Sequence, residues 1–229
     1  MLPTELDGAK DTLRQWVLLE IRSAFLDAAQ GAVRLLGESS VVQRWDDESV
    51  LAEFSVAALA GHLLRSIKTV DLYLNAPAPD GERVTAAQYY LSFDITPDIS
   101  SPLNRDVRKR GAEMAAAGPV AVAEEARRLV GRLSERLERE ESGRGVAVLG
   151  GLAMSLDDYL CTRVVELVVH LDDLALSVGK DASVSLDPST TGWAISTLVD
   201  IARLRHGDVA VVRSLSRRER DVVNALRVL

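Results

Sequence analysis

The sequence contains a single cysteine, Cys161, among its 229 residues. One cysteine excludes an intramolecular disulfide and any zinc site built from several cysteines. Long apolar runs are also missing, because stretches without Asp, Glu, Lys or Arg, such as 145–156, reach only twelve residues. A membrane-spanning helix needs about 20 apolar residues, and the first residues lack the pattern of a secretory signal. We therefore expect a cytoplasmic protein without a membrane partner.

The sequence also has fewer basic residues than acidic ones. Lys and Arg total 27 and Asp and Glu total 34, for a net charge of −7. This balance argues against a general nucleic-acid binder, which must neutralise phosphates. From Arg203 onward, seven arginines against three acidic residues give +4, which leaves −11 for the rest of the chain. Hydrophobic residues make up 47% of the sequence, and this predicts a folded core instead of disorder.

Apolar residues recur at helical spacing along most of the chain, which predicts a mainly α-helical fold. Ser55 and Ser155 are suitable N-caps for two of the helices, and Gly179 is a suitable stop. We expect helices over about 4–36, 56–75, 104–117, 120–140, 156–178 and 188–205. Four of these are long, and one lengthy connection joins them over 78–102, which together predict a four-helix bundle with additional elements.

The predicted bundle occupies residues 1–180. Residues 181–229 form a short basic extension that we expect to pack on the bundle. With about 50 residues, this extension is shorter than a normal domain.

Two residues of the predicted helix 156–178 are the main candidates for a functional site. Glu166 and His170 lie one helical turn apart, about 40° from each other around the axis. Most of their neighbours in sequence are Val and Leu, so burying both without partners would be costly. The pair must therefore face water, contact each other or bind a ligand, and its spacing suits a shared metal ion. Taken alone, the pair favours an i,i+4 contact on a solvent-facing stripe.

A third residue comes from the predicted helix 56–75. His62 borders the apolar face of that helix beside hydroxyl side chains, which suits either a ligand in a cleft or a histidine hydrogen-bonded to one of those hydroxyls. Gly61 would allow another helix to approach closely. Two histidines and one carboxylate leave coordination positions open, as in catalytic zinc and non-haem iron sites. A thiol bound to such a metal would be deprotonated.

Four further residues are weaker candidates. Arg163 is placed to hold a substrate carboxylate or to form a salt bridge with Glu166. Asp173 lies one turn after His170 and either orients that histidine or faces solvent. Ser66 could support His62, and Arg213 either reaches the site from the basic extension or contributes surface charge.

The segments SVAALAGHLLRS (55–66) and DDYLCTRVVELVVHLDDLALSVG (157–179) resemble the mycothiol-dependent maleylpyruvate isomerase family of the DinB-like superfamily. The resemblance covers about 13–179. It implies that His62, Glu166 and His170 bind a divalent metal, foremost Zn²⁺, and that mycothiol is the thiol cosubstrate. Mycothiol belongs to GC-rich actinobacterial organisms, and 23 arginines against four lysines fit such a genome.

The family's isomerase also carries an α/β domain with a substrate-contacting arginine, for which the residues after Gly179 are too few. The resemblance thus implies a metal- and mycothiol-dependent isomerase or S-transferase that acts on a small electrophilic substrate. A non-catalytic metal-binding or regulatory bundle is the alternative, and the sequence leaves a homodimer open.

Overall fold

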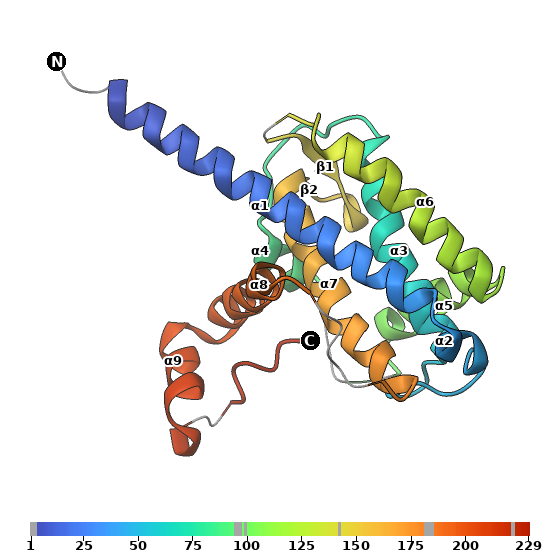
Figure 1. Cartoon of the computed structure of the whole chain (residues 1–229). Helices are drawn as coiled ribbons and strands as arrows, with labels where there is room; N and C mark the ends of the chain where they lie inside the picture. Colours follow the sequence, from blue (N-terminus) through green and yellow to red (C-terminus); the bar gives the residue numbers. More distant parts are fainter. Residues whose placement is uncertain (1–3, 94–97, 99, 142, 181–185, 221–222) are drawn as a thin grey trace.

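The chain folds mainly into helices, as the apolar spacing predicts (Figure 1). The structure is a computed structural model that describes residues 4–93, 98, 100–141, 143–180, 186–220 and 223–229, with side chains from residue 20 onward. No helix in these ranges has the length and apolar character required to span a membrane.

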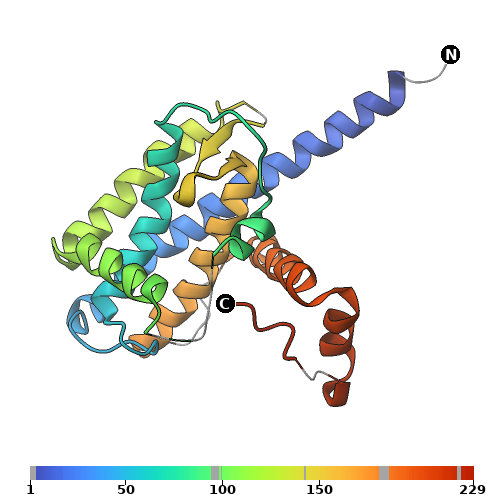
Figure 2. The same cartoon turned by 180° about the vertical axis from the view of Figure 1, so that it is seen from behind.

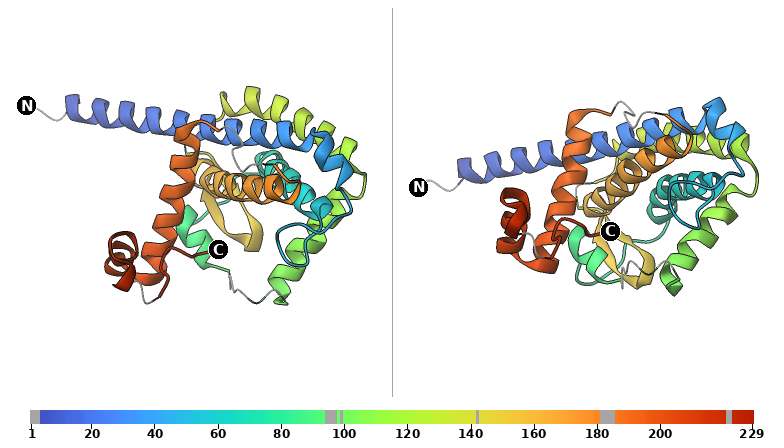
Figure 3. Two further views of the ribbon diagram at one scale, coloured as in Figure 1. Left: turned by 60° about the horizontal axis from the view of Figure 1, so that its bottom comes forward. Right: turned by 90° about the horizontal axis from the view of Figure 1, so that it is seen from below.

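Four long helices form the bundle. They are α1 (Thr4–Leu36), α3 (Val56–Leu74), α6 (Pro119–Leu137) and α7 (Leu156–Ser177). Helices α1 and α3 each pack against both α6 and α7, so the four helices form a ring around one core. The N-terminal part of α1 projects beyond this ring (Figures 1 and 3). The predicted four-helix bundle is therefore confirmed.

The other elements surround the ring. They are α2 (Ser39–Gln43), α4 (Ala86–Leu91), α5 (Pro102–Ala115), β1 (Gly145–Ala147), η1 (Leu149–Gly151), β2 (Ala153–Ser155), α8 (Pro188–His206), α9 (Asp208–Ser216) and η2 (Arg218–Arg220). Strands β1 and β2 pair as a small antiparallel hairpin, with Val146 opposite Met154.

Serine caps determine where the two site-bearing helices begin. The hydroxyl of Ser55 accepts a hydrogen bond from the Ala58 amide at 3.1 Å, and α3 starts at the next residue. The hydroxyl of Ser155 accepts one from the Asp158 amide at 3.0 Å, and α7 starts at the next residue. Both bonds satisfy amides that lack partners within the helix, so both predicted caps are confirmed.

A buried arginine ties three helices of the ring together. Nε of Arg22 on α1 lies 3.1 Å from Oδ1 of Asp157 on α7. Nη1 of the same side chain donates to the carbonyls of Leu137 and Glu140, each at 2.8 Å, at the C-terminal end of α6. These carbonyls have no partner within the helix, so Arg22 both caps α6 and fixes its position against α7.

Three segments contain helices that the apolar periodicity did not reveal, the first of them α2. The connection over 78–102 includes α4, which begins with a capping box between Thr85 and Gln88. The stretch after the predicted helix 188–205, within the basic extension, contains α9 and η2. All of these helices have nine residues or fewer, which is too short to show a clear period of 3.6.

Helix α5 crosses α3 at almost backbone contact. A Cβ atom added to Gly61 would lie 2.0 Å from the carbonyl oxygen of Gly111, and one added to Gly111 would lie 2.4 Å from the carbonyl oxygen of Ala58. Only glycine fits at such a crossing. The close approach expected at Gly61 is thus observed, and it sets α5 beside His62.

Helix α8 covers one side of the bundle and packs against α7, α4 and α1 (Figure 2). The last residues of the chain return from η2 toward the bundle. Ala225 and Val228 are buried, and Arg205 donates a hydrogen bond to the Val228 carbonyl at 2.9 Å. The C-terminal segment is therefore anchored on α8.

Candidate metal centre

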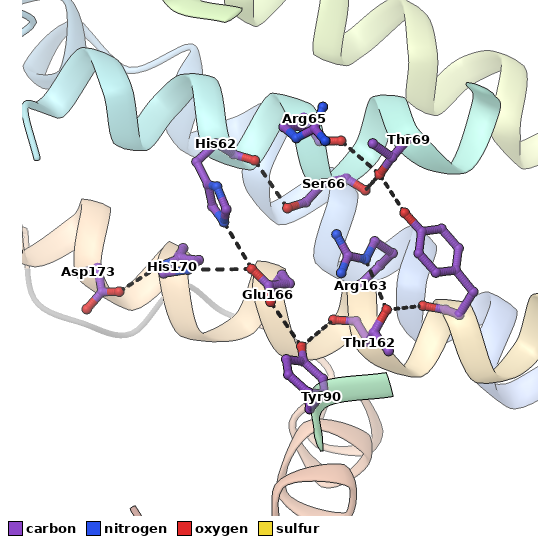
Figure 4. Close-up of polar contacts among 11 residues, drawn as sticks. His62, Arg65, Ser66, Thr69, Tyr90, Thr162, Arg163, Glu166, His170 and Asp173 are labelled. Carbon is purple, nitrogen blue, oxygen red and sulfur yellow. Dashed lines mark hydrogen bonds and ion pairs between the residues drawn. The ribbon is translucent and has the colours of Figure 1, made fainter. Parts of the chain in front are cut away.

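Helices α3 and α7 bring His62, Glu166 and His170 together on facing sides (Figure 4). One ligand atom from each residue lies within 4.8 Å of the others. Nε2 of His62 is 3.0 Å from Oε2 of Glu166, and Nε2 of His170 is 3.7 Å from the same oxygen. The three side chains are 12%, 18% and 21% exposed, respectively. The three residues identified in the sequence thus form one half-buried cluster.

Further hydrogen bonds orient two of these side chains. The phenol of Tyr90, on α4, donates to Oε1 of Glu166 at 3.0 Å, which leaves Oε2 facing the histidines. Oδ2 of Asp173 lies 2.8 Å from Nδ1 of His170, which leaves Nε2 of that ring facing Glu166. Such partners of ligand side chains fix the tautomer and orientation in metal sites.

The protonation states of the cluster suit metal ligands. Burial alone would raise the pKa of Glu166, but the hydrogen bond from His62 and the charge of Arg163 hold that pKa well below its ordinary value. Burial lowers the pKa of His62 and outweighs the hydrogen bond to Glu166. The cluster therefore combines an ionised carboxylate with a neutral imidazole, the forms that coordinate metals.

A cavity of about 480 Å³ adjoins the cluster. His62, Glu166 and His170 all contribute to its lining, as does Arg163. The apolar and aromatic part of the lining includes Phe54, Tyr89, Phe93, Leu103, Leu149 and Leu229. This volume lies in the range of small-molecule sites.

Arg163 lies in the cavity wall without an ion pair to Glu166 among the described residues. Its Nε donates to Oγ1 of Thr162 at 3.1 Å, and its guanidinium carbon lies 4.9 Å from the ring centroid of Tyr159. The salt bridge that the sequence offered as an alternative is therefore not formed.

Other residues named from the sequence lie farther from the cavity. Ser66 is fully buried, and its hydroxyl donates to the His62 carbonyl at 3.1 Å, so it bonds the backbone of His62 and not its imidazole. Arg213 is exposed on α9 and is not among the residues that line the cavity. Cys161 also lies outside the lining, and burial raises the pKa of its thiol to about 12.

Two contributors to the site escaped sequence reasoning. Tyr90 lies in the connection over 78–102, where the capping box at Thr85 and Gln88 was a usable signal for a helix. Leu229 comes from the C-terminal segment. No feature of the sequence indicated that Leu229 lines the cavity, because its position depends on how the chain returns to the bundle.

The fold and the cluster together define a DinB-like helical bundle with a candidate metal centre between α3 and α7. The sequence pattern of the mycothiol maleylpyruvate isomerase N-terminal domain matches residues 25–175, which contain the whole cluster. The chain belongs to this family. The resemblance noted in the sequence is thereby confirmed.

Solved structures share the fold. A crystal structure of the mycothiol-dependent maleylpyruvate isomerase aligns with a TM-score of 0.50 at 17% identity, over 80% of this chain and 68% of that one. The structure of a histidine-to-alanine mutant of that isomerase aligns with a TM-score of 0.51 at 16% identity, over the same shares. No curated protein sequence gives a significant match.

Proposed function

We propose that this protein is a metal- and mycothiol-dependent enzyme, an isomerase or S-transferase that acts on a small electrophilic substrate. The observation that carries the proposal is the convergence of His62, Glu166 and His170 on one wall of a cavity large enough for a small molecule. Membership of the family supports mycothiol as the thiol. The similar solved structures, described as a mycothiol-dependent isomerase, support the reaction class.

The donor set fits a divalent metal, foremost zinc. Two imidazole nitrogens and one carboxylate oxygen are typical ligands of catalytic zinc, which keeps a further coordination position for a water or a substrate. A bound metal of this kind would lower the pKa of a coordinated thiol and so supply a thiolate at neutral pH. His62, Glu166 and His170 would hold it.

Other residues of the site would support metal binding and a reactive thiolate. Tyr90 and Asp173 hold the carboxylate and one imidazole in position, so little reorganisation accompanies binding. Aromatic and apolar side chains form much of the cavity wall, and they exclude water from a reactive thiolate. Arg163 places a positive charge beside the cluster.

Metal content and thiol consumption test the proposal. Protein purified without chelators is expected to contain about one divalent metal per chain by elemental analysis, and to consume mycothiol when electrophiles are added. His62→Ala and His170→Ala should each lose the metal. His206→Ala is the matched control, because His206 is the one histidine outside the cluster.

Two results would contradict the proposal. Stoichiometric metal in both His62→Ala and His170→Ala would show that the ion binds elsewhere. A metal-loaded protein that consumes no mycothiol with any of a broad panel of electrophiles would instead favour the non-catalytic alternative.

A further inference from the structure

Side chains of α3 contact side chains of α7 at successive levels along the two helices, and each level forms one layer. In the first layer His62 on α3 contacts Glu166 on α7. In another layer Thr69 on α3 accepts a hydrogen bond from Tyr159 on α7 at 2.7 Å. Residue numbers rise along α3 as they fall along α7, so the two helices are antiparallel and the layers stay in register.

Two arginines lie between these layers. Arg65 follows His62 by three residues on α3, and Arg163 precedes Glu166 by three residues on α7. Three residues advance a helix by about 4.5 Å, so both arginines belong to a layer next to the cluster. Both line the cavity, and Figure 4 shows Arg163 between Glu166 and Thr69.

Neither of these two guanidinium groups lies within ion-pair distance of a carboxylate among the described residues. Of the four arginines that line the cavity, Arg108 pairs with Glu53 at 2.8 Å and Arg110 approaches Asp106 at 3.9 Å. Neither Arg65 nor Arg163 forms an ion pair with any described residue. Glu166 acts on Arg163 only from beyond that distance, so both half-buried cations lack a direct partner, and an anionic ligand would supply one.

Contacts with neighbouring residues fix the Arg163 side chain in a position that suits such a ligand. Its Nε is occupied by Thr162, and its plane is supported by the Tyr159 ring. The hydroxyl of Tyr159 is in turn held by Thr69. The two terminal nitrogens have no partner among the described residues. A fixed guanidinium fork matches the two oxygens of a carboxylate.

Away from the arginines the cavity wall is largely apolar. Phe54 and Leu103 line it from the side of α3 and α5, and Leu149 lines it from the hairpin. Leu229 adds an apolar side chain from the C-terminal segment, next to the anchored Val228. This wall offers contact area to a hydrophobic group. The two other arginines that line it, Arg108 and Arg110, already lie within 4.0 Å of the carboxylates of Glu53 and Asp106, so a second anionic group is expected to gain less there.

We propose that the cavity binds a monocarboxylate with an apolar body, whose carboxylate is held by Arg163 and Arg65 and whose body lies against the apolar wall. The proposal rests on the proposed function for the statement that this ligand is the electrophilic substrate. A carboxylate in the arginine layer places the carbons next to it beside the cluster. Binding itself depends on the arginines and not on the metal.

Three probes of equal chain length test this assignment by calorimetric titration of the intact protein. Octanoate, octanedioate and octanamide carry charges of −1, −2 and zero on the same eight-carbon chain. Octanoate is expected to bind about tenfold or more tightly than either of the others, since a hydrogen bond to a charged group contributes enough for that ratio. Competition among the three would confirm that they share one site.

Variants locate the carboxylate. Arg163→Gln should reduce octanoate binding about tenfold, to the level of octanamide, and Arg163→Lys should give an intermediate loss because it keeps the charge without the fork. Arg108→Gln is the matched control, since Glu53 already neutralises that guanidinium, and it should change octanoate binding less than about threefold. Thermal unfolding of each variant checks that the fold is retained.

Several outcomes would overturn the inference. Equal binding of octanoate and octanamide would show that the ligand need not be anionic. Tighter binding of octanedioate would show that the far end of the site does not require an apolar group. Loss of octanoate binding in His170→Ala but not in Arg163→Gln would place the carboxylate on the cluster. By contrast, if protein purified without chelators contained no metal and still bound octanoate, the proposed function would be refuted and this subsite would stand.

Discussion

The phenol oxygen of Tyr90 lies 3.0 Å from Oε1 of Glu166, a residue 76 positions further along the chain. The other oxygen of this carboxylate lies 3.0 Å from Nε2 of His62. One oxygen is thus held by α4 and the other faces the histidines, so the carboxylate cannot rotate without losing one of these contacts. A short helix outside the bundle therefore orients the central residue of the candidate metal centre.

Replacing Tyr90 with Phe should weaken metal binding. Loss of its hydrogen bond frees the Glu166 carboxylate, and removal of such a supporting partner costs about 10–100-fold in metal affinity. Competition with a chromophoric chelator measures the zinc dissociation constant. Tyr89→Phe is the control, because Tyr89 lines the same cavity and its hydroxyl has no hydrogen bond to a described residue. Equal affinities for the two variants would disprove this role of Tyr90.

Asp173→Ala should also weaken zinc binding by about 10–100-fold, because the His170 ring loses the acceptor 2.8 Å from its Nδ1. Asp172→Ala removes the same charge from the neighbouring, exposed position and should leave the affinity nearly unchanged. The same chelator competition applies. Equal losses in both variants would mean that only the local negative charge matters, and not the hydrogen bond.

Gly61→Ala should destabilise the fold by about 1–3 kcal/mol or more, as expected for an atom forced into a filled space. The new Cβ would lie 2.0 Å from the Gly111 carbonyl oxygen, so α5 would have to move away from α3. Gly131→Ala is the control, because a Cβ there meets no atom within 4 Å. It should raise stability by about 0.5–1 kcal/mol, since alanine favours helices. Urea unfolding distinguishes the two, and an unchanged midpoint for Gly61→Ala would refute the close crossing.

Cys161 should resist alkylation in the folded protein. Burial raises the pKa of its thiol from 9.0 to about 12, so at pH 8 the reactive thiolate is about a thousandfold scarcer than in the unfolded chain. The rate with iodoacetamide should keep rising about tenfold per pH unit past pH 9. The folded state holds this proton more tightly, so the linked stability is present below about pH 9 and is lost as the pH rises. A rate that levels off near pH 9 would contradict the raised pKa.

Local sequence signals predicted much of the fold. Ser55 and Ser155 marked the starts of α3 and α7 because a serine cap acts on amides within three residues. Apolar spacing revealed the long helices, since each presents several turns of one buried face. Helix α4, with only six residues, was too short for that signal, and its capping box went unused.

The candidate site was predictable only in part. Glu166 and His170 lie one turn apart in any helix, so their shared face follows from the sequence. The position of His62 opposite them does not, because the contact joins residues 104 positions apart. Sequence similarity to a family supplied that link, where periodicity alone left a solvent-facing pair as the favoured interpretation.

The sequence by itself determined the helical class, the capped starts of α3 and α7 and the one-turn spacing of Glu166 and His170. Each of these depends on hydrogen bonds and geometry within a few residues. The family resemblance named His62, but only the tertiary structure brought it to the other two residues. Only the tertiary structure decided that Tyr90 orients the cluster and that Leu229 closes part of the cavity. These relationships depend on how distant segments pack, and packing is a property of the whole core.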